Sequence, residues 1–260
     1  MLIDTHCHLA NAKLLPQIKQ TVEQAITMGV SRVICATATL EESRKAQQIA
    51  RDFENIFCQA GIHPHHAEQT TDDDLAQIAE LMQFEKCVAL GEIGLDYHYD
   101  YSPRDHQRKA FEAQLDLAKQ LNCPVAIHTR EAFEDTIAII RNSGFAGEKI
   151  IFHSFTAGPD EAKICLDLGA MLSFSGIATF RSAEKTTLQS AVICPADRMT
   201  VETDAPFLSP EPIRQIKINT PGNVKYVAQK IADKKRIDFE EFAQQTTQNA
   251  CKFFELPDLR

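Results

Sequence analysis

Residues that could carry chemistry recur where the short apolar runs of this sequence end. The first run closes on "HCH", and a run near residue 200 closes on "ETDAP". Imidazole and carboxylate groups bind divalent metal ions and transfer protons, and packing alone does not require them at these positions. The pattern therefore indicates a metal site, and the set is His6, His8, His63, Glu92, His128, His153, Glu202 and Asp204.

The "HCH" triplet has the spacing of a ligand pair. Side chains of a strand alternate between its two faces, so His6 and His8 point the same way, with Cα atoms roughly 6–7 Å apart. Cys7 must point to the opposite face. The triplet therefore predicts two ligands on one cation and one packing cysteine.

Imidazoles outnumber carboxylates in the predicted ligand set. A mononuclear catalytic zinc site uses three protein ligands, so a larger set favours two divalent cations bridged by one carboxylate. Ligands of this kind accept Mg²⁺, Mn²⁺, Zn²⁺, Fe or Co, and a pair of such ions suits phosphoester hydrolysis. The predicted metal ligands are His6, His8, Glu92, His128, His153 and Asp204.

Short apolar runs alternate with helical patterns along the whole chain. Continuous apolar strands alternating with helices are typical of a parallel sheet, and eight such units in about 250 residues match an α/β (β/α)₈ TIM barrel. In that fold the C-terminal ends of the strands form the active-site face. A doubly wound sheet is the alternative, although no G-x-G-x-x-G follows the first strand. We predict one domain over residues 1–260, with helices near 15–28, 41–53, 73–84, 104–121, 132–141, 160–168, 183–192, 224–232 and 239–254.

Composition narrows the class of protein. The 260 residues carry a net charge of −9, which disfavours nucleic-acid binding through a broad basic surface. The eight cysteines form no CxxC pair, and we expect buried, reduced thiols. We see neither a signal peptide, since Asp4 and His6 interrupt the N-terminus, nor a membrane span. A cytoplasmic protein is expected.

Six motifs together resemble the TatD family of metal-dependent deoxyribonucleases, which belongs to the amidohydrolase-like superfamily. They occur in order between residues 3 and 210, as "DTHCHL", "GIHP", "GEIGLDYHYD", "PVAIHTREA", "FHSF" and "VETDAPFLSP". The resemblance implies a TIM barrel with a metal centre at its C-terminal mouth. It also implies a hydrolase that cleaves DNA, commonly as a 3′–5′ exonuclease on single strands.

The resemblance also implies individual roles. His6 and His8 match the ligands of one metal, His128 and His153 match those of the second, and Glu92 matches the bridging carboxylate. Asp204 matches the last ligand, which also orients or deprotonates the attacking water, so Glu92 and Asp204 are the predicted catalytic residues.

Residues around the ligands have expected roles of their own. His63 matches a histidine that contacts the substrate phosphate, and Arg130 is predicted to assist it or else to pair with Glu131 or Glu134. Glu202 is predicted to orient a ligand imidazole. Asp96 and Tyr97 either line the substrate groove or start a turn, and Phe155 and Phe207 either stack a base or pack. The histidines expected to be solvated are His65, His66, His98 and His106.

One segment departs from the family pattern. Members usually carry a basic stretch close to "RGKRNEP" after the eighth strand, whereas this chain reads "SPEPIRQIKINTPGNV". Asn219 and Pro221 remain, but Thr220 replaces the acidic residue. The departure keeps a second function open, hydrolysis of a small-molecule ester, amide or lactone by the same metal centre. The expected partner is therefore either DNA with single-stranded ends or a small-molecule substrate. We also expect the protein to be a monomer.

Overall fold

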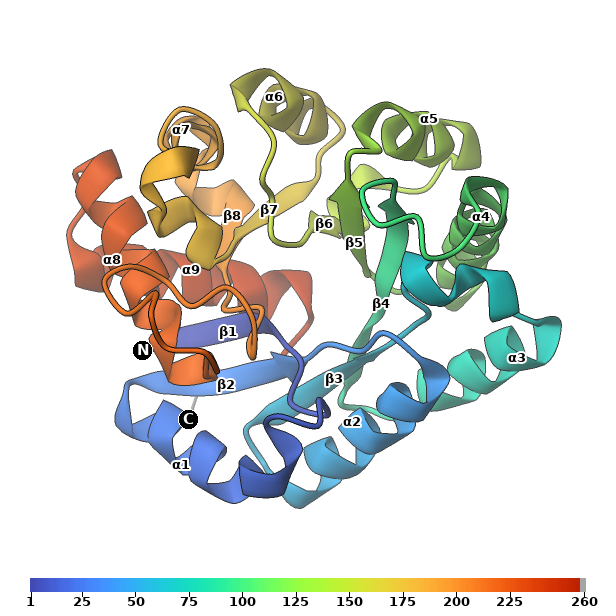
Figure 1. Cartoon of the computed structure of the whole chain (residues 1–260), viewed down its shortest axis with the longest axis horizontal. Coiled ribbons are helices and arrows are strands. Elements are labelled where there is room, and N and C mark those ends of the chain that lie inside the picture. The colour runs from blue at the N-terminus through green and yellow to red at the C-terminus, as the bar shows by residue number, and fades with distance from the viewer. Residues whose placement is uncertain (258–260) are drawn as a thin grey trace. The chain divides into compact units, whose positions relative to one another are not determined.

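The computed structural model describes residues 1–257 of the chain (Figure 1). Within this range, eight strands follow one another through the sheet in sequence order, and helices alternate with them. This is the (β/α)₈ barrel that the alternating pattern predicts. No helix in the same range is long and apolar enough to cross a lipid bilayer.

Seven of the eight described strands have three to six residues, and β4 has ten. Their bounds are β1 (Leu2–Cys7), β2 (Val30–Cys35), β3 (Ile56–Ala60), β4 (Cys87–Asp96), β5 (Val125–Arg130), β6 (Ile150–Phe152), β7 (Met171–Phe174) and β8 (Met199–Val201). The α-helices are α1 (Ile18–Thr27), α2 (Leu40–Asp52), α3 (Asp72–Leu81), α4 (Arg104–Leu121), α5 (Phe133–Ser143), α6 (Pro159–Asp167), α7 (Thr187–Ile193), α8 (Val224–Lys235) and α9 (Phe239–Phe253).

The contacts divide the chain into two compact units, of which the first comprises Met1–Cys35 and the chain from His153 onward. Here β1 pairs with β2, and β7 pairs with β8, both in parallel. Every residue of β1 is buried, as expected of a strand covered on both faces. Cys7 forms an isolated bridge with Ala205, so the end of β1 lies beside the segment that follows β8.

The second unit comprises Ala36–Phe152, and β3, β4, β5 and β6 pair in parallel within it (Figure 1). The register of β4 and β5 places Gly94 beside His128 and Asp96 beside Arg130. A Cβ atom at Gly94 would lie 2.0 Å from the carbonyl oxygen of His128. Only glycine therefore allows this close approach, and the two strands run together to the ends that carry functional side chains.

Two expectations about the elements need correction. Glu92 is not at the end of its strand, because pairing with β5 extends β4 to Asp96. The seventh helix starts at Thr187 rather than near residue 183, because a 3₁₀ turn over Arg181–Ala183 comes first. The single domain over residues 1–260 stays a prediction.

Candidate metal centre

The end of β1 and the segment after β8 build the first cluster of predicted site residues. The backbone N–H of Asp204 donates to the carbonyl of His6 at 2.9 Å, and that of His8 donates to the carbonyl of Ala205 at 2.7 Å. Asp204 has a positive φ of 53°, which aspartate tolerates better than most residues. These backbone contacts bring Asp204 to the histidine pair.

The rings of His6 and His8 lie together, as the "HCH" spacing predicts, and the Asp204 carboxylate lies beside both. His8 Nε2 lies 3.3 Å from Asp204 Oδ1, and His6 Nε2 lies 3.9 Å from the same oxygen. The ring centroids of His6 and His8 are 5.1 Å apart, while Cys7 is fully buried. The cluster thus offers two imidazoles and one carboxylate to a common point.

His153 and Glu202 complete this first cluster. The rings of His6 and His153 are stacked with centroids 3.9 Å apart. His153 Nδ1 lies 3.1 Å from Glu202 Oε1, which also accepts the N–H of Ser154 at 2.8 Å. Glu202 therefore fixes both the ring and the backbone of the histidine segment.

The two aspartates of this unit differ in environment. Burial opposes the charge of Asp204, but the hydrogen bond from His8, together with the nearby His153 and His6 imidazoles, lowers its pKa below the ordinary value. Burial instead raises the pKa of Asp4, although Thr203 donates to both of its carboxylate oxygens. Asp4 thus ties β1 to the segment after β8, whereas Asp204 is ionised and available to a cation or a proton.

The second cluster lies in the other unit and brings together Glu92, His128 and His63. His128 Nδ1 lies 2.8 Å and His63 Nε2 lies 3.3 Å from Glu92 Oε1. The rings of His63 and His128 are 4.5 Å apart between centroids. Burial lowers the pKa of His63 to about 3, so this imidazole is neutral near pH 7.

Sequence reasoning did not assign Asp96 or His65 to the second cluster. Asp96 starts a turn, as one of its two expected roles has it, because its Oδ1 accepts the N–H groups of His98 and Tyr99. Asp96 is only 1% exposed, and its Oδ2 lies 3.0 Å from His128 Nε2 and 3.1 Å from His65 Nε2. The expectation that His65 is solvated is wrong, because a 3₁₀ turn over Pro64–Gln69 directs it toward β4 and β5. A signal was present, since His63 and His65 repeat the H-x-H spacing of the first strand.

Arg130 is exposed at the end of β5. Its guanidinium lies 4.8 Å from the ring centroid of Tyr99. Within residues 1–257 it makes no ion pair with Glu131 or Glu134, and Glu131 instead contacts His98 at 2.7 Å. The ion-pair alternative for Arg130 is thus wrong.

The aromatic residues near the clusters divide into packing and exposed groups. Phe155 is 2% exposed and packs edge-on against Phe174. Tyr97 donates to Asp135 at 2.6 Å, so it belongs to the interface with α5. Phe207 is 44% exposed, and its ring centroid lies 6.0 Å from that of His8. Of these three, only Phe207 could still meet a substrate.

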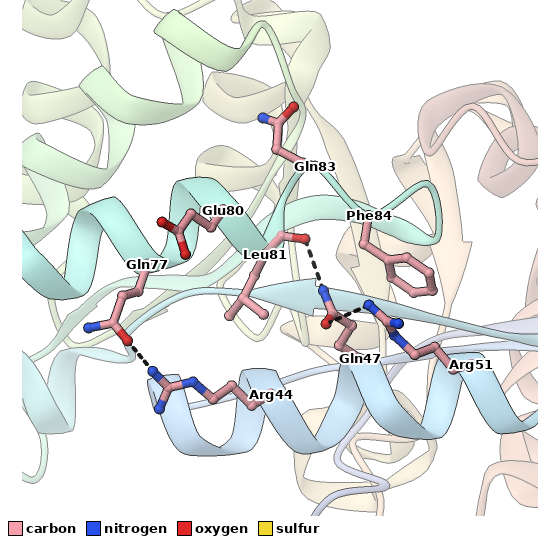
Figure 2. A pocket seen from close by; sticks show the side chains of 8 residues that line it. All are labelled: Arg44, Gln47, Arg51, Gln77, Glu80, Leu81, Gln83 and Phe84. Atoms are coloured by element: carbon pink, nitrogen blue, oxygen red, sulfur yellow. Dashed lines mark hydrogen bonds between the residues drawn. The ribbon is translucent and has the colours of Figure 1, made fainter.

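A hollow of about 450 Å³ between α2 and α3 contains none of the predicted site residues. Figure 2 shows that Arg44 reaches Gln77 across it and that Arg51 contacts Gln47 beside Phe84. Its polar side chains come from the surfaces of two helices and bond mainly to one another. The candidate chemistry therefore lies in the two clusters at the strand ends rather than in this hollow.

The donor atoms of both clusters fit divalent metal ions. The ligand atoms of His6, His153 and Glu202 lie within 4.8 Å of one another, and so do those of His63, Glu92 and His128. Glu202 is fully buried, and its Oε2 has no hydrogen-bond partner within the described part of the chain. A buried carboxylate oxygen without a donor is costly unless a cation or a proton satisfies it.

The barrel and these imidazole–carboxylate clusters define the class of metal-dependent hydrolases. Over residues 3–255 the sequence matches the family described as TatD related DNase. The chain belongs to this family, and it is a hydrolase that depends on a metal.

Relatives and solved structures agree with this assignment. An uncharacterized metal-dependent hydrolase of Bacillus subtilis, YabD, is 40% identical to this chain. The alignment covers 98% of this chain and 100% of YabD. A protein of Erwinia amylovora named 3′-5′ ssDNA/RNA exonuclease TatD is 31% identical, and the alignment covers 98% of this chain and 100% of that protein. The crystal structure of the TatD homologue YJJV from Escherichia coli has a TM-score of 0.92, 26% identity and 98% of each chain covered.

Proposed function

We propose that this protein is a nuclease that removes nucleotides from the 3′ ends of single-stranded DNA with two divalent cations. The observation that carries the proposal is that the six predicted ligands lie in two clusters of imidazole and carboxylate groups. His6, His8, His153 and Asp204 lie in one cluster, whereas Glu92 and His128 lie in the other. The relative named as an exonuclease supports the choice of substrate.

The six residues would hold two cations, as the resemblance to the family implies. When bound, the cations supply positive charge that promotes ionisation of water near neutral pH and neutralises a phosphodiester. The candidate metals are Mg²⁺, Mn²⁺, Zn²⁺, Fe and Co. Positive charge held locally in this way would allow an acidic chain to accept an acidic substrate.

The protein groups around the ligands have distinct tasks in this proposal. Asp204 orients the attacking water and takes its proton, from a position beside His6 and His8. Glu202 orients the imidazole of His153 through Nδ1, and Asp96 orients that of His128 through Nε2. His63 is neutral, so it would donate a hydrogen bond to a phosphate oxygen without carrying a charge, and Arg130 would hold the neighbouring phosphate.

The segment that departs from the family pattern favours one second candidate, a hydrolase of a small apolar ester, amide or lactone. Arg214 does not project freely from this segment. Its guanidinium lies 3.9 Å from the ring centroid of Phe180 and 3.8 Å from Glu211. Ile216 and Ile218 are 44% and 38% exposed on either side of the exposed Lys217, so the segment presents apolar surface with fewer basic side chains than the family pattern.

A cleavage assay with an Asp204→Asn variant tests the proposed function. Metal-stripped protein reloaded with Mg²⁺ or Mn²⁺ meets 5′-labelled single-stranded DNA on one gel. The account predicts a ladder that shortens from the 3′ end, with a loss of roughly 10²–10⁴-fold in the variant.

The control for this assay is Asp197→Asn, which changes an exposed aspartate of the same unit and should cleave normally. Intact DNA in the presence of bound metal would refute the nuclease and favour the small-molecule hydrolase.

Location and assembly complete the proposal. The cysteines of the described chain are free thiols, and all but Cys123 and Cys251 are buried, which suits a reducing cytoplasm. We propose a cytoplasmic monomer, and light scattering on the eluting protein would detect any larger assembly.

A further inference from the structure

The loop that joins β4 to α4 exposes two tyrosines beside the second cluster. Tyr99 and Tyr101 are 47% and 66% exposed. Their rings are stacked, with centroids 5.2 Å apart and an angle of 12° between the planes. Large aromatic side chains exposed in this way do not stabilise a core, so their arrangement calls for another explanation.

The tyrosine pair is in direct contact with one histidine of the cluster, His65. The ring of His65 packs edge-on against Tyr101 at 4.8 Å and against Tyr99 at 5.5 Å between centroids. The same ring lies 4.2 Å from that of His63. His65 therefore links the exposed tyrosines to the histidine predicted to contact the substrate phosphate.

One carboxylate fixes both the tyrosine loop and the ligand histidine. Oδ1 of Asp96 accepts the backbone N–H groups of His98 and Tyr99 at 3.0 and 2.9 Å. Its Oδ2 lies 3.0 Å from Nε2 of His128. The position of the rings relative to the second cluster is thus set by a buried group rather than by a freely moving loop.

The charged side chains around the two tyrosines leave one positive side chain available to a ligand. The carboxylate of Glu131 is paired with His98 at 2.7 Å, and that of Asp100 is paired with Arg104. Arg130 lies over the ring of Tyr99 at 4.8 Å, and within residues 1–257 no carboxylate lies in ion-pair distance of its guanidinium. A ligand that reaches the tyrosines therefore meets a flat apolar surface and one unpaired positive charge.

We infer that Tyr99 and Tyr101 form a stacking platform for the base of the 3′-terminal nucleotide, with Arg130 on its phosphate. A nucleotide carries both a flat base and a negative charge, and base stacking on aromatic side chains is the general device of single-strand binding. Because Tyr99 already contacts Arg130 and Tyr101, the more exposed ring of Tyr101 is the one that offers a face to the base. Stacking does not depend on base identity, so the platform predicts cleavage with little sequence preference. This inference rests on the proposed nuclease function.

Kinetics on two matched DNA strands test the platform. One strand is normal, and the other carries an abasic tetrahydrofuran residue at its 3′ end. Tyr101→Ala should raise KM on the normal strand on the order of 10-fold, with a smaller change in kcat, whereas Tyr101→Phe should restore the wild-type value. On the abasic strand Tyr101→Ala should cause little further loss, because there is no base to stack.

A binding measurement separates failure of the platform from failure of the nuclease. The Asp204→Asn variant is mixed with Mg²⁺ and a strand that ends in 2-aminopurine, whose fluorescence falls when it stacks on an aromatic ring. Quenching should disappear when Tyr101→Ala is added to Asp204→Asn, and it should persist with Tyr101→Phe. Tyr226→Ala, which changes a half-buried tyrosine of α8 in the other unit, is the control and should leave quenching unchanged.

Each outcome decides between the two claims. If Tyr101→Ala binds and cleaves the normal strand as the wild type does, the platform is overturned. Equal losses on both strands would also overturn it, because they would show a purely structural role for Tyr101. Quenching by a wild-type protein that cleaves no DNA would keep the platform and refute the nuclease.

Discussion

At the scale of single residues, the carboxylates that hold the ligand histidines matter as much as the ligands. Glu202 holds Nδ1 of His153, and Asp96 holds Nε2 of His128. Such partners fix the orientation of a ring and raise its basicity as a ligand. The sequence predicts this role for Glu202 from the expected alternation at the end of the eighth strand, although β8 already ends at Val201. No pattern marks Asp96 as the partner of His128.

Loss of the orienting carboxylate should weaken metal binding. Glu202→Gln keeps the shape of the side chain but removes the charge that faces His153, so we expect Mn²⁺ affinity to fall roughly 10–100-fold by titration calorimetry. Glu211→Gln, which changes an exposed carboxylate of the same unit, provides the matched control. Unchanged affinity in Glu202→Gln would show that Glu202 does not support a ligand.

The buried cysteines should resist alkylation even at alkaline pH. Burial raises the pKa of the Cys194 thiol to about 12, so at pH 9 only about one molecule in a thousand carries the reactive thiolate. Peptide mapping after iodoacetamide treatment of the native protein at pH 9 should therefore find Cys194 unmodified. The protein unfolded in guanidinium should be modified at every cysteine. Rapid modification of native Cys194 would contradict the buried, neutral thiol.

At the scale of elements, the order of strands and helices along the chain was predictable from the sequence. The contacts made by the irregular segments between them were not. Strands and helices follow from apolar runs and periodicity, and the ends of α4 and α8 agree with the expected ranges within three residues. The contact of His65 with Asp96 depends on a 3₁₀ turn and on a strand about 30 residues away. Local patterns do not encode such contacts, so the second cluster was only partly predictable.

The C-terminus of α7 offers an element-scale prediction about stability. The ammonium of Lys235 donates to the carbonyls of Ala191, Val192 and Cys194 at 3.2, 2.8 and 2.6 Å, which satisfies groups that a helix end leaves without partners. Lys235→Met should lower the free energy of unfolding by roughly 1–2 kcal/mol in a denaturant titration.

Lys234→Met is the matched control for this prediction. Its ammonium pairs with Glu184 at the surface, where the two side chains are 42% and 58% exposed, and such pairs contribute little. Equal effects of the two substitutions would contradict the capping role of Lys235.

At the scale of the whole molecule, the proposed enzyme and its proposed substrate carry charge of the same sign. The net charge of −9 opposes nucleic acid at long range, and beside the second cluster Arg130 is an exposed cation with no ion pair inside residues 1–257. Two divalent cations held by the six predicted ligands would reverse the local sign of the charge. The proposed activity therefore depends on the metals both for binding the substrate and for the chemistry.

The most direct test follows nucleotide release against the number of bound Mn²⁺ ions per chain, in one titration of the stripped protein. The account predicts no release from single-stranded DNA before metal is added. It predicts full release when two ions are bound, and release slower by roughly 10²–10⁴-fold at the same Mn²⁺ concentration in the Asp204→Asn variant. Release without metal, or intact DNA with two ions bound to the wild type, would contradict it.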